Sequence, residues 1–237
     1  MERVSVISGK RKNIMIVAPH GVDDCYTIEI ATTIANNLQC QAVINNGFQR
    51  SKKPDTLNDL ANCNDRDHCL KDPVVKQEFL DPILKFAQDA LPRRGQENCY
   101  IFYIHGMNNK LDVSTVLGYG LGLQKDRLTM NEEKVHYLYH DINTSRTALG
   151  NMHMGALIGE GGGKYAARSF SNITQFFRIQ PFEYHHVQSL QIEINGKERK
   201  DAKSAELFAD RLAPFLFNIT DDQLTSGFKL NEPFLVA

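Results

Sequence analysis

Two histidines and several carboxylates follow apolar segments of this sequence at places where strands are expected to end. His20 comes directly after the first long apolar run, and Asp23 and Asp24 lie three and four residues further on. His105 follows a later apolar run, and Glu193 lies near the end of a third. Two imidazoles and one carboxylate form a three-ligand set for Zn²⁺, which leaves a fourth position for water. A separate glutamate can accept the proton of that water, so the pattern predicts metal-assisted hydrolysis.

Each of these residues also has a purely structural interpretation. Asp23 or Asp24 would make a good N-cap for a helix that starts just after them. Glu193 could be an ordinary outward-facing residue of its strand, although a buried charge there would need a cationic or metal-bound partner. The functional interpretation is favoured by the joint placement of all these groups at strand ends.

The surrounding segments alternate between strand and helix patterns. Residues 14–18 and 100–104 are uninterrupted apolar runs typical of buried strands, and residues 189–194 alternate in strand fashion. Helical spacing of apolar residues covers 24–38 and 202–217. This alternation predicts an α/β fold, a three-layer α/β/α sandwich around a mixed, mostly parallel sheet. The carboxyl ends of parallel strands share one edge, where the two histidines would meet.

The remaining segments are less regular. Residues 41–44 read as a short second strand, and residues 45–72 form a long polar connection with almost no apolar periodicity. A helix is expected over 74–91, a further strand over 113–117 and a helix over 166–177. A polar connection of such length in a compact domain is usually functional or disordered.

Length and composition restrict the class of protein. The 237 residues predict a single domain, residues 1–237, with ordinary globular usage of 42% hydrophobic and 23% charged residues. Lys+Arg 27 against Asp+Glu 28 leaves a net charge of −1 and no basic stripe, so nucleic acid is an unexpected partner. The longest apolar run, 99–104, is far below the ~20 residues of a membrane span. Without a secretory signal pattern, we expect a cytoplasmic protein that does not contact membranes.

Several familiar motifs are incomplete. The glycine-rich segments 118–124 and 159–165 fail the spacing of the dinucleotide and phosphate-loop motifs, and the sequence has no GxSxG or HExxH. The five cysteines form an odd set without a CxxC pair, which favours reduced thiols. Cys63, His68 and Cys69 lack a second ligand pair and are therefore predicted to be loop and core residues.

Three blocks of the sequence resemble one known family. The blocks are APHGVDDCYTIEIA (residues 18–31), YIHGM (103–107) and LQIEIN (190–195). In order and separation they resemble the N-formylglutamate amidohydrolase-like family and the related phage poly-gamma-glutamate hydrolases, within the zinc carboxypeptidase and aspartoacylase architecture. The resemblance implies a phosphorylase/hydrolase-like fold, one Zn²⁺ per chain, and hydrolysis of an amide attached to an acidic amino acid. A small molecule or a short acidic peptide would be the substrate.

The resemblance also implies roles for individual residues. His20 and His105 would be zinc ligands, and Glu193 would be the general base. The carboxylate ligand is either Asp23, by the spacing of carboxypeptidase-type sites, or Asp24, by alignment with the poly-gamma-glutamate hydrolase pattern. Both differ from the glutamate that is usual in the family.

The same resemblance suggests Arg50 as a substrate-binding residue, and Arg168 is a second and weaker candidate. Arg50, in the long polar connection, and Arg168, after the second glycine-rich segment, could bind a substrate carboxylate or a developing oxyanion. A surface role is the alternative for both arginines. The Asp-for-Glu change also leaves a second function open, a catalytically inactive protein that binds small molecules or acidic peptides in the same cleft. The sequence indicates no oligomeric state.

Overall fold

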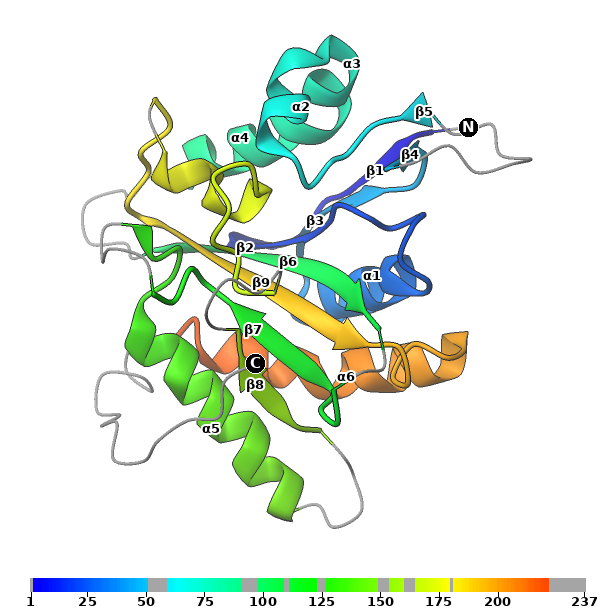
Figure 1. The fold of residues 1–237 in the computed structure, drawn as a ribbon, viewed down its shortest axis with the longest axis vertical. Helices are drawn as coiled ribbons and strands as arrows, with labels where there is room; N and C mark the ends of the chain where they lie inside the picture. Colours follow the sequence, from blue (N-terminus) through cyan, green and yellow to red (C-terminus); the bar gives the residue numbers. More distant parts are fainter. Residues whose placement is uncertain are drawn as a thin grey trace.

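The computed structural model describes residues 2–50, 59–90, 98–108, 111–122, 127–148, 154–159, 165–179 and 181–221. Within these residues a seven-stranded sheet has the order β1-β3-β2-β6-β9-β7-β8, and β4 and β5 pair in a separate small sheet (Figure 1). The strands are β1 (Val4–Ile7), β2 (Arg11–Ala18), β3 (Cys40–Asn45), β4 (Phe48–Gln49), β5 (Asp59–Leu60), β6 (Cys99–Met107), β7 (Thr115–Gly118), β8 (Ala156–Ile158) and β9 (Val187–Asn195).

The centre of the large sheet is parallel. Strands β3, β2, β6 and β9 run in the same direction, whereas β1 is antiparallel to β3 and β7 is antiparallel to β9. The sheet is therefore mixed and mostly parallel, as the alternation of elements predicts. Because β2, β6 and β9 are neighbours, their carboxyl ends lie side by side at one edge.

Helices cover both faces of this sheet and complete three layers (Figure 1). Helices α1 and α6 pack together on one face, and α5 lies beside them against β8. Helices α2 to α4, with η1 and η3, cover the other face. The helical segments are α1 (Thr27–Leu38), α2 (Arg66–Lys71), α3 (Pro73–Val75), a π-helical turn η1 (Lys76–Leu80), α4 (Asp81–Asp89), α5 (Glu132–Ala148), a 3₁₀ helix η3 (Ile173–Arg178) and α6 (Ala202–Asn218).

Strand alternation assigns the side chains of the central strands to two cores. In β6, Tyr100, Phe102 and Ile104 belong to the core under α1, α5 and α6. Ile101 and Tyr103 belong to the core under α2 to α4 and η3. The next residue on this second face is at position 105, so the end of β6 presents its histidine there.

The structure differs from the sequence expectations in three places. The long polar connection contains the short helix α2, which has an N-cap: the Asp65 carboxylate accepts from the His68 backbone N–H at 2.9 Å. The helix expected over 166–177 forms only as η3, because the segment before it is irregular and Ala167 has φ 55°. The helix expected over 74–91 forms over 73–89 as the contiguous segments α3, η1 and α4, with a π-helical turn at η1 and Pro73 in its first turn.

The ends of several elements also extend beyond the expected ranges. Strands β1 and β8 were not expected, and β6 and β9 are longer than their apolar runs. The last residue of the helix expected over 74–91 lies outside the described residues. Among the residues described, no helix is long and apolar enough to cross a membrane.

Candidate metal centre

A tight turn after β2 brings Asp24 back toward His20. The carbonyl of His20 accepts hydrogen bonds from the backbone N–H groups of Asp23 and Asp24, at 2.9 and 2.8 Å. Thr27 then begins α1, and its hydroxyl donates to the Asp24 carbonyl at 2.8 Å. The four-residue spacing therefore folds a histidine and a carboxylate onto one side of the loop.

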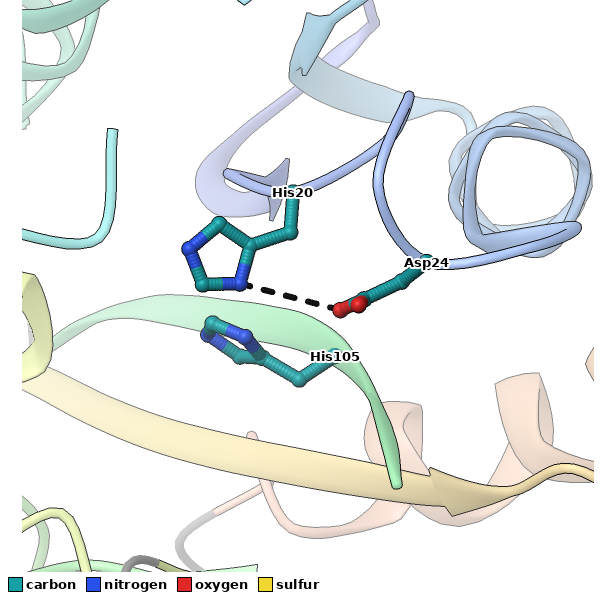
Figure 2. A group of neighbouring side chains, drawn as sticks. All are labelled: His20, Asp24 and His105. Carbon is teal, nitrogen blue, oxygen red and sulfur yellow. Dashed lines mark ion pairs between the residues drawn. The ribbon is translucent and has the colours of Figure 1, made fainter. Parts of the chain in front are cut away.

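His105 joins this pair from the end of β6. The His20 and His105 rings lie edge to face, with centroids 5.0 Å apart. The backbone N–H of Gly106 donates to Asp24 Oδ2 at 3.0 Å, which fixes the carboxylate next to the strand. Figure 2 shows the three side chains converging, with a dashed line between His20 Nδ1 and Asp24 Oδ2, which are 3.7 Å apart. One ligand atom from each residue lies within 4.8 Å of the others.

The three side chains are buried, and the environment of Asp24 and His105 favours the charge states that metal binding requires. His20, Asp24 and His105 are 6%, 8% and 2% exposed. Burial, and to a smaller extent the neighbouring His20 side chain, lowers the pKa of His105 to about 3, so this imidazole is neutral near pH 7. Burial raises the pKa of Asp24, but the neighbouring His20 and Arg50 side chains and the hydrogen bond from the Gly106 N–H outweigh it and lower the pKa to about 2. A neutral imidazole and an ionised carboxylate are metal-ligating forms.

The side chain of Asn62 fixes the tautomer of His20. The backbone N–H of Asn64 donates to Asn62 Oδ1 at 3.1 Å, which identifies that atom as the amide oxygen. His20 Nε2 lies 3.0 Å from the same oxygen and must therefore donate its proton to it. In the neutral ring, Nδ1 then carries the lone pair that faces Asp24. A lone pair facing a carboxylate is repulsive unless a cation lies between them or the ring takes a second proton.

The residues present fit a divalent metal ion. The donor set is two imidazoles and a carboxylate, which suits Zn²⁺ and also other divalent transition metals. His105 Nε2 is buried and has no hydrogen-bond partner among the described residues, a costly state for a polar atom. The Asn62 bond to His20 is of the kind that orients metal-ligating histidines.

The two candidate aspartates have different surroundings. Asp23 Oδ2 accepts from the Arg50 backbone N–H at 2.8 Å and lies 3.3 Å from Arg50 Nε. Asp24, by contrast, lies in the group with both histidines. The Arg50 guanidinium bridges the two, since its second nitrogen contact is to Asp24 Oδ1 at 2.9 Å. Asp24 therefore lies in the group with His20 and His105, whereas Asp23 lies next to that group and binds Arg50.

The two predicted arginines are in different places. Arg50 lies at the edge of the histidine pair, with its side chain 43% exposed. Arg168 donates to the carbonyl of Gly122 at 3.3 Å and lies against that glycine.

Glu193 lies beside His105 on the neighbouring strand. The two residues are register partners in the parallel pair β6 and β9, so their side chains leave the sheet on the same face. Glu193 is buried, and its Oε1 accepts from Gln191 Nε2 at 3.0 Å. Gln191 in turn accepts from Asn172 at 2.8 Å. Sequence reasoning found Glu193 but not these two amides, although the alternation of β9 puts residue 191 on the same face.

Arg199 holds the strand ends that carry these groups. Its buried guanidinium donates to the carbonyls of Ile194, Met107 and Cys25, at 3.1, 3.0 and 2.6 Å. Gly106 packs directly on this guanidinium, where a Cβ atom would be 2.5 Å from its central carbon. Burial lowers the pKa of Arg199, and the nearby Asp24 carboxylate counteracts this. Nothing in the sequence marked this residue, because its partners are backbone atoms of three separate segments.

The cysteine and histidine trio of the polar connection has a structural role, as predicted. Cys63 and Cys69 are fully buried in the core under α2 to α4, and the Cys69 thiol contacts the Cys63 carbonyl at 3.4 Å. Burial raises the pKa of Cys69 to about 12, so it is a thiol at neutral pH. His68 Nδ1 accepts the backbone N–H of Asn62 at 3.3 Å, which supports the residue that orients His20.

Comparison with known proteins gives likenesses of structure only. No protein-family model matches the sequence, and no curated protein matches it significantly. A gene product of Agrobacterium tumefaciens is 10% identical, covers 93% of this chain and 95% of its own, and has a TM-score of 0.57. A bacteriophage poly-gamma-glutamate hydrolase is 12% identical, with coverage of 92% and 90% and a TM-score of 0.50. N-formylglutamate amidohydrolase from Ralstonia eutropha is 11% identical, with coverage of 92% and 99% and a TM-score of 0.46.

These likenesses show a shared fold over nearly the whole chain. The α/β fold with a mixed, mostly parallel sheet is therefore shared with the first two structures. At such low identity, metal, substrate and reaction do not transfer with the fold. They have to be argued from the site.

Proposed function

We propose that this chain is a zinc-dependent amidohydrolase that cleaves an amide bond attached to an acidic amino acid. The observation that carries the proposal is the buried group of His20, Asp24 and His105 with Glu193 directly beside it. The substrate would be an N-acyl amino acid such as N-formylglutamate, or a gamma-glutamyl or peptide bond. The poly-gamma-glutamate hydrolase among the structural neighbours is consistent with this class.

The metal would be held by His20, Asp24 and His105. A bound Zn²⁺ supplies Lewis-acid polarisation of a carbonyl and a lowered pKa for water near it. The His20 ring is already oriented for this by Asn62, and the Asp24 carboxylate by Gly106. Such pre-orientation reduces the cost of organising the site when the ion binds.

Glu193 would move the proton. As a carboxylate it can accept a proton from the attacking water and then donate it to the nitrogen of the leaving amine. This second transfer matters because an amine anion is a poor leaving group. Its register position next to His105 supports the role, since water near the metal would lie within reach of both strands.

Arg50 would recognise the acidic part of the substrate or the developing oxyanion. Its guanidinium lies at the rim of the site and is bound to Asp23 and Asp24, so a substrate carboxylate would meet a cation that is already oriented. Arg168 is the weaker second candidate, because its described hydrogen bond is to a backbone carbonyl away from the histidine pair.

The first test is metal content, measured by plasma mass spectrometry on protein purified without a histidine tag. Wild type should hold about one zinc per chain, and His20→Ala and His105→Ala should lose it. His140→Ala is the matched control, because this exposed histidine lies on α5 and should leave the content unchanged. Asp24→Asn should release far more metal than Asp23→Asn. Zinc-free wild type, even after zinc is added back, would contradict the proposal and support a binding protein on the same fold.

The second test is turnover on a panel of N-acyl amino acids and gamma-glutamyl peptides. Glu193→Gln should keep its zinc and lose about 10²- to 10⁴-fold in kcat, the usual contribution of a general base. Full activity in Glu193→Gln would refute the assigned role of this residue. Full activity in His20→Ala would refute the metal mechanism as a whole.

A further inference from the structure

We infer that Asn172 and Gln191 are positioning residues, a chain of two side-chain amides that orients Glu193 and keeps it an acceptor. The inference rests on the proposed role of Glu193 and extends it to residues outside the metal group. The chain is short and continuous: Asn172 Nδ2 lies 2.8 Å from Gln191 Oε1, and Gln191 Nε2 lies 3.0 Å from Glu193 Oε1.

The direction of this chain is set by a backbone group. The N–H of Thr174 donates to Asn172 Oδ1 at 2.8 Å, at the start of η3. A backbone N–H can only donate, so the oxygen of Asn172 must face it and the NH₂ must face Gln191. Gln191 then has to present its oxygen to Asn172 and its NH₂ to Glu193. At the end of the chain, Glu193 Oε1 can only accept, which is what an ionised carboxylate does.

Burial makes this direction costly to reverse. Gln191 is 1% exposed and Glu193 is 7% exposed, so water is scarce around the bonds between them. A flipped Gln191 amide would point its oxygen at the carboxylate and its NH₂ at the NH₂ of Asn172. Each mismatch would leave a buried polar atom without a partner. The buried chain therefore keeps a single orientation.

The anchor of the chain is itself held firmly. Asn172 forms a β-bridge with Asp65, and its backbone N–H donates to the Ser169 carbonyl at 3.0 Å. Asp65 is the N-cap of α2, which ties the polar connection to the start of η3. Gln191 and Glu193 are two residues apart on β9 and so share one face. The orientation of the proposed base is thus determined by loops on one side of the sheet and by strand geometry on the other.

The variant Asn172→Asp isolates this effect. It keeps the size of the side chain and the oxygen that caps η3, because aspartate is also a good N-cap. It removes the NH₂, so Gln191 must turn its own NH₂ toward residue 172 and its oxygen toward Glu193. We expect kcat to fall about 10- to 100-fold with little change in KM or zinc content, and Tm to fall because the turned amide faces the buried carboxylate.

A double-mutant cycle tests whether Gln191 transmits the effect. Gln191→Leu should lower kcat by a similar factor, and Asn172→Asp should have little further effect in that background. Asn143→Asp is the matched control, since this amide makes comparable bonds to Tyr139 and Ala156 on α5 and β8. It should change Tm and leave kcat as in wild type.

Nuclear magnetic resonance of the metal-free protein gives a readout that does not need turnover. The Gln191 side-chain NH₂ signals, identified by their loss in Gln191→Leu, should be shifted from those of a solvent-exposed glutamine. They should move in both Glu193→Gln and Asn172→Asp, and not in Asn143→Asp. The inference would be overturned if the Gln191 NH₂ signals had the chemical shifts of an exposed glutamine and did not move in either variant.

The outcomes separate this inference from the proposed function. If Glu193→Gln is inactive but Asn172→Asp and Gln191→Leu keep wild-type kcat, Glu193 is the base and the positioning inference is wrong. If the two effects on kcat simply multiply, Gln191 does not transmit the change and the inference is also wrong. If Glu193→Gln is fully active, the proposed function fails first, whatever the resonances show.

Discussion

Strand β6 presents two different faces to the same end of the sheet. On the face under α1, α5 and α6, the side chains of Tyr100, Phe102 and Ile104 belong to the hydrophobic core. On the opposite face, Tyr103 is followed by His105. Both rows are fully buried or nearly so, yet only the second carries an imidazole.

Strand β9 repeats this contrast. Leu190, Ile192 and Ile194 belong to the apolar core, whereas Gln191 and Glu193 lie on the polar face with His105. Loops reach the polar face and bring amides to it, Asn62 at His20 and Asn172 at Gln191. The comparison shows that loops supply the hydrogen-bond partners of the buried polar groups at this end of the sheet.

The largest expected effect is on the apolar face. Ile104→Ala removes a fully buried side chain, and we expect a loss of about 2–5 kcal/mol in the free energy of unfolding. His105→Gln, one residue away on the polar face, should change the stability of the metal-free protein far less and abolish zinc binding. Urea titration and metal analysis of both variants check this. Equal losses of stability would mean that the two faces do not differ in the way described.

A smaller loss of stability is expected from a change at Arg199, which binds backbone carbonyls at the strand ends. Arg199→Lys replaces a planar fork by a single ammonium that cannot reach three carbonyl oxygens at once. We expect a loss of about 1–3 kcal/mol in the free energy of unfolding and weaker zinc binding, because Gly106 and the loop of Asp24 would lose their support. Lys197→Arg, a swap on an exposed ion pair nearby, serves as the control and should be neutral. Unchanged zinc affinity in Arg199→Lys would show that the hydrogen bonds of Arg199 do not support the metal site.

A third expected effect is a pH dependence that originates on the polar face. In the folded metal-free protein the pKa of His105 is about 3, below its ordinary 6.5, so the unfolded chain binds a proton that the folded chain does not. Stability should therefore fall as the pH is lowered from 6.5 toward 3. Asp24, with its pKa lowered from 3.8 to about 2, adds a loss of the same sign below about pH 4.

Urea unfolding of metal-free protein at several pH values measures this slope. His105→Gln should reduce the dependence of the free energy of unfolding on pH between 6.5 and 4. Ile104→Ala should lower this free energy by the same amount at every pH. An unchanged slope in His105→Gln would show that other groups cause the acid sensitivity.

Much of the fold could be predicted from the sequence, and the exceptions have physical reasons. Long apolar runs and helical spacing were enough for β2, β6, β9, α1 and α6. Strand β1 was missed because it is a short edge strand of the described sheet in which only Val4 is buried, so it has no long apolar run. Helix α2 was missed because six residues hold too little periodicity, and an N-cap and a buried cysteine stabilise it instead.

The candidate site could be predicted in part. His20, His105 and Glu193 were recognisable because strand ends in a parallel sheet share an edge. The choice between Asp23 and Asp24 could not be made, since one residue of difference in a turn reverses which side chain faces the histidine. That the whole chain forms one domain remains a prediction.

The sequence by itself determined which strands end in imidazoles and carboxylates, because apolar runs and their interruptions are local properties of the chain. Only the tertiary structure decided which carboxylate faces the histidines and which side chains hold them in place. Asn62, Asn172 and Arg199 act through contacts to distant segments or to backbone carbonyls. Such contacts leave no periodic trace in a sequence, since a hydrogen bond depends on distance and direction in space and not on separation along the chain.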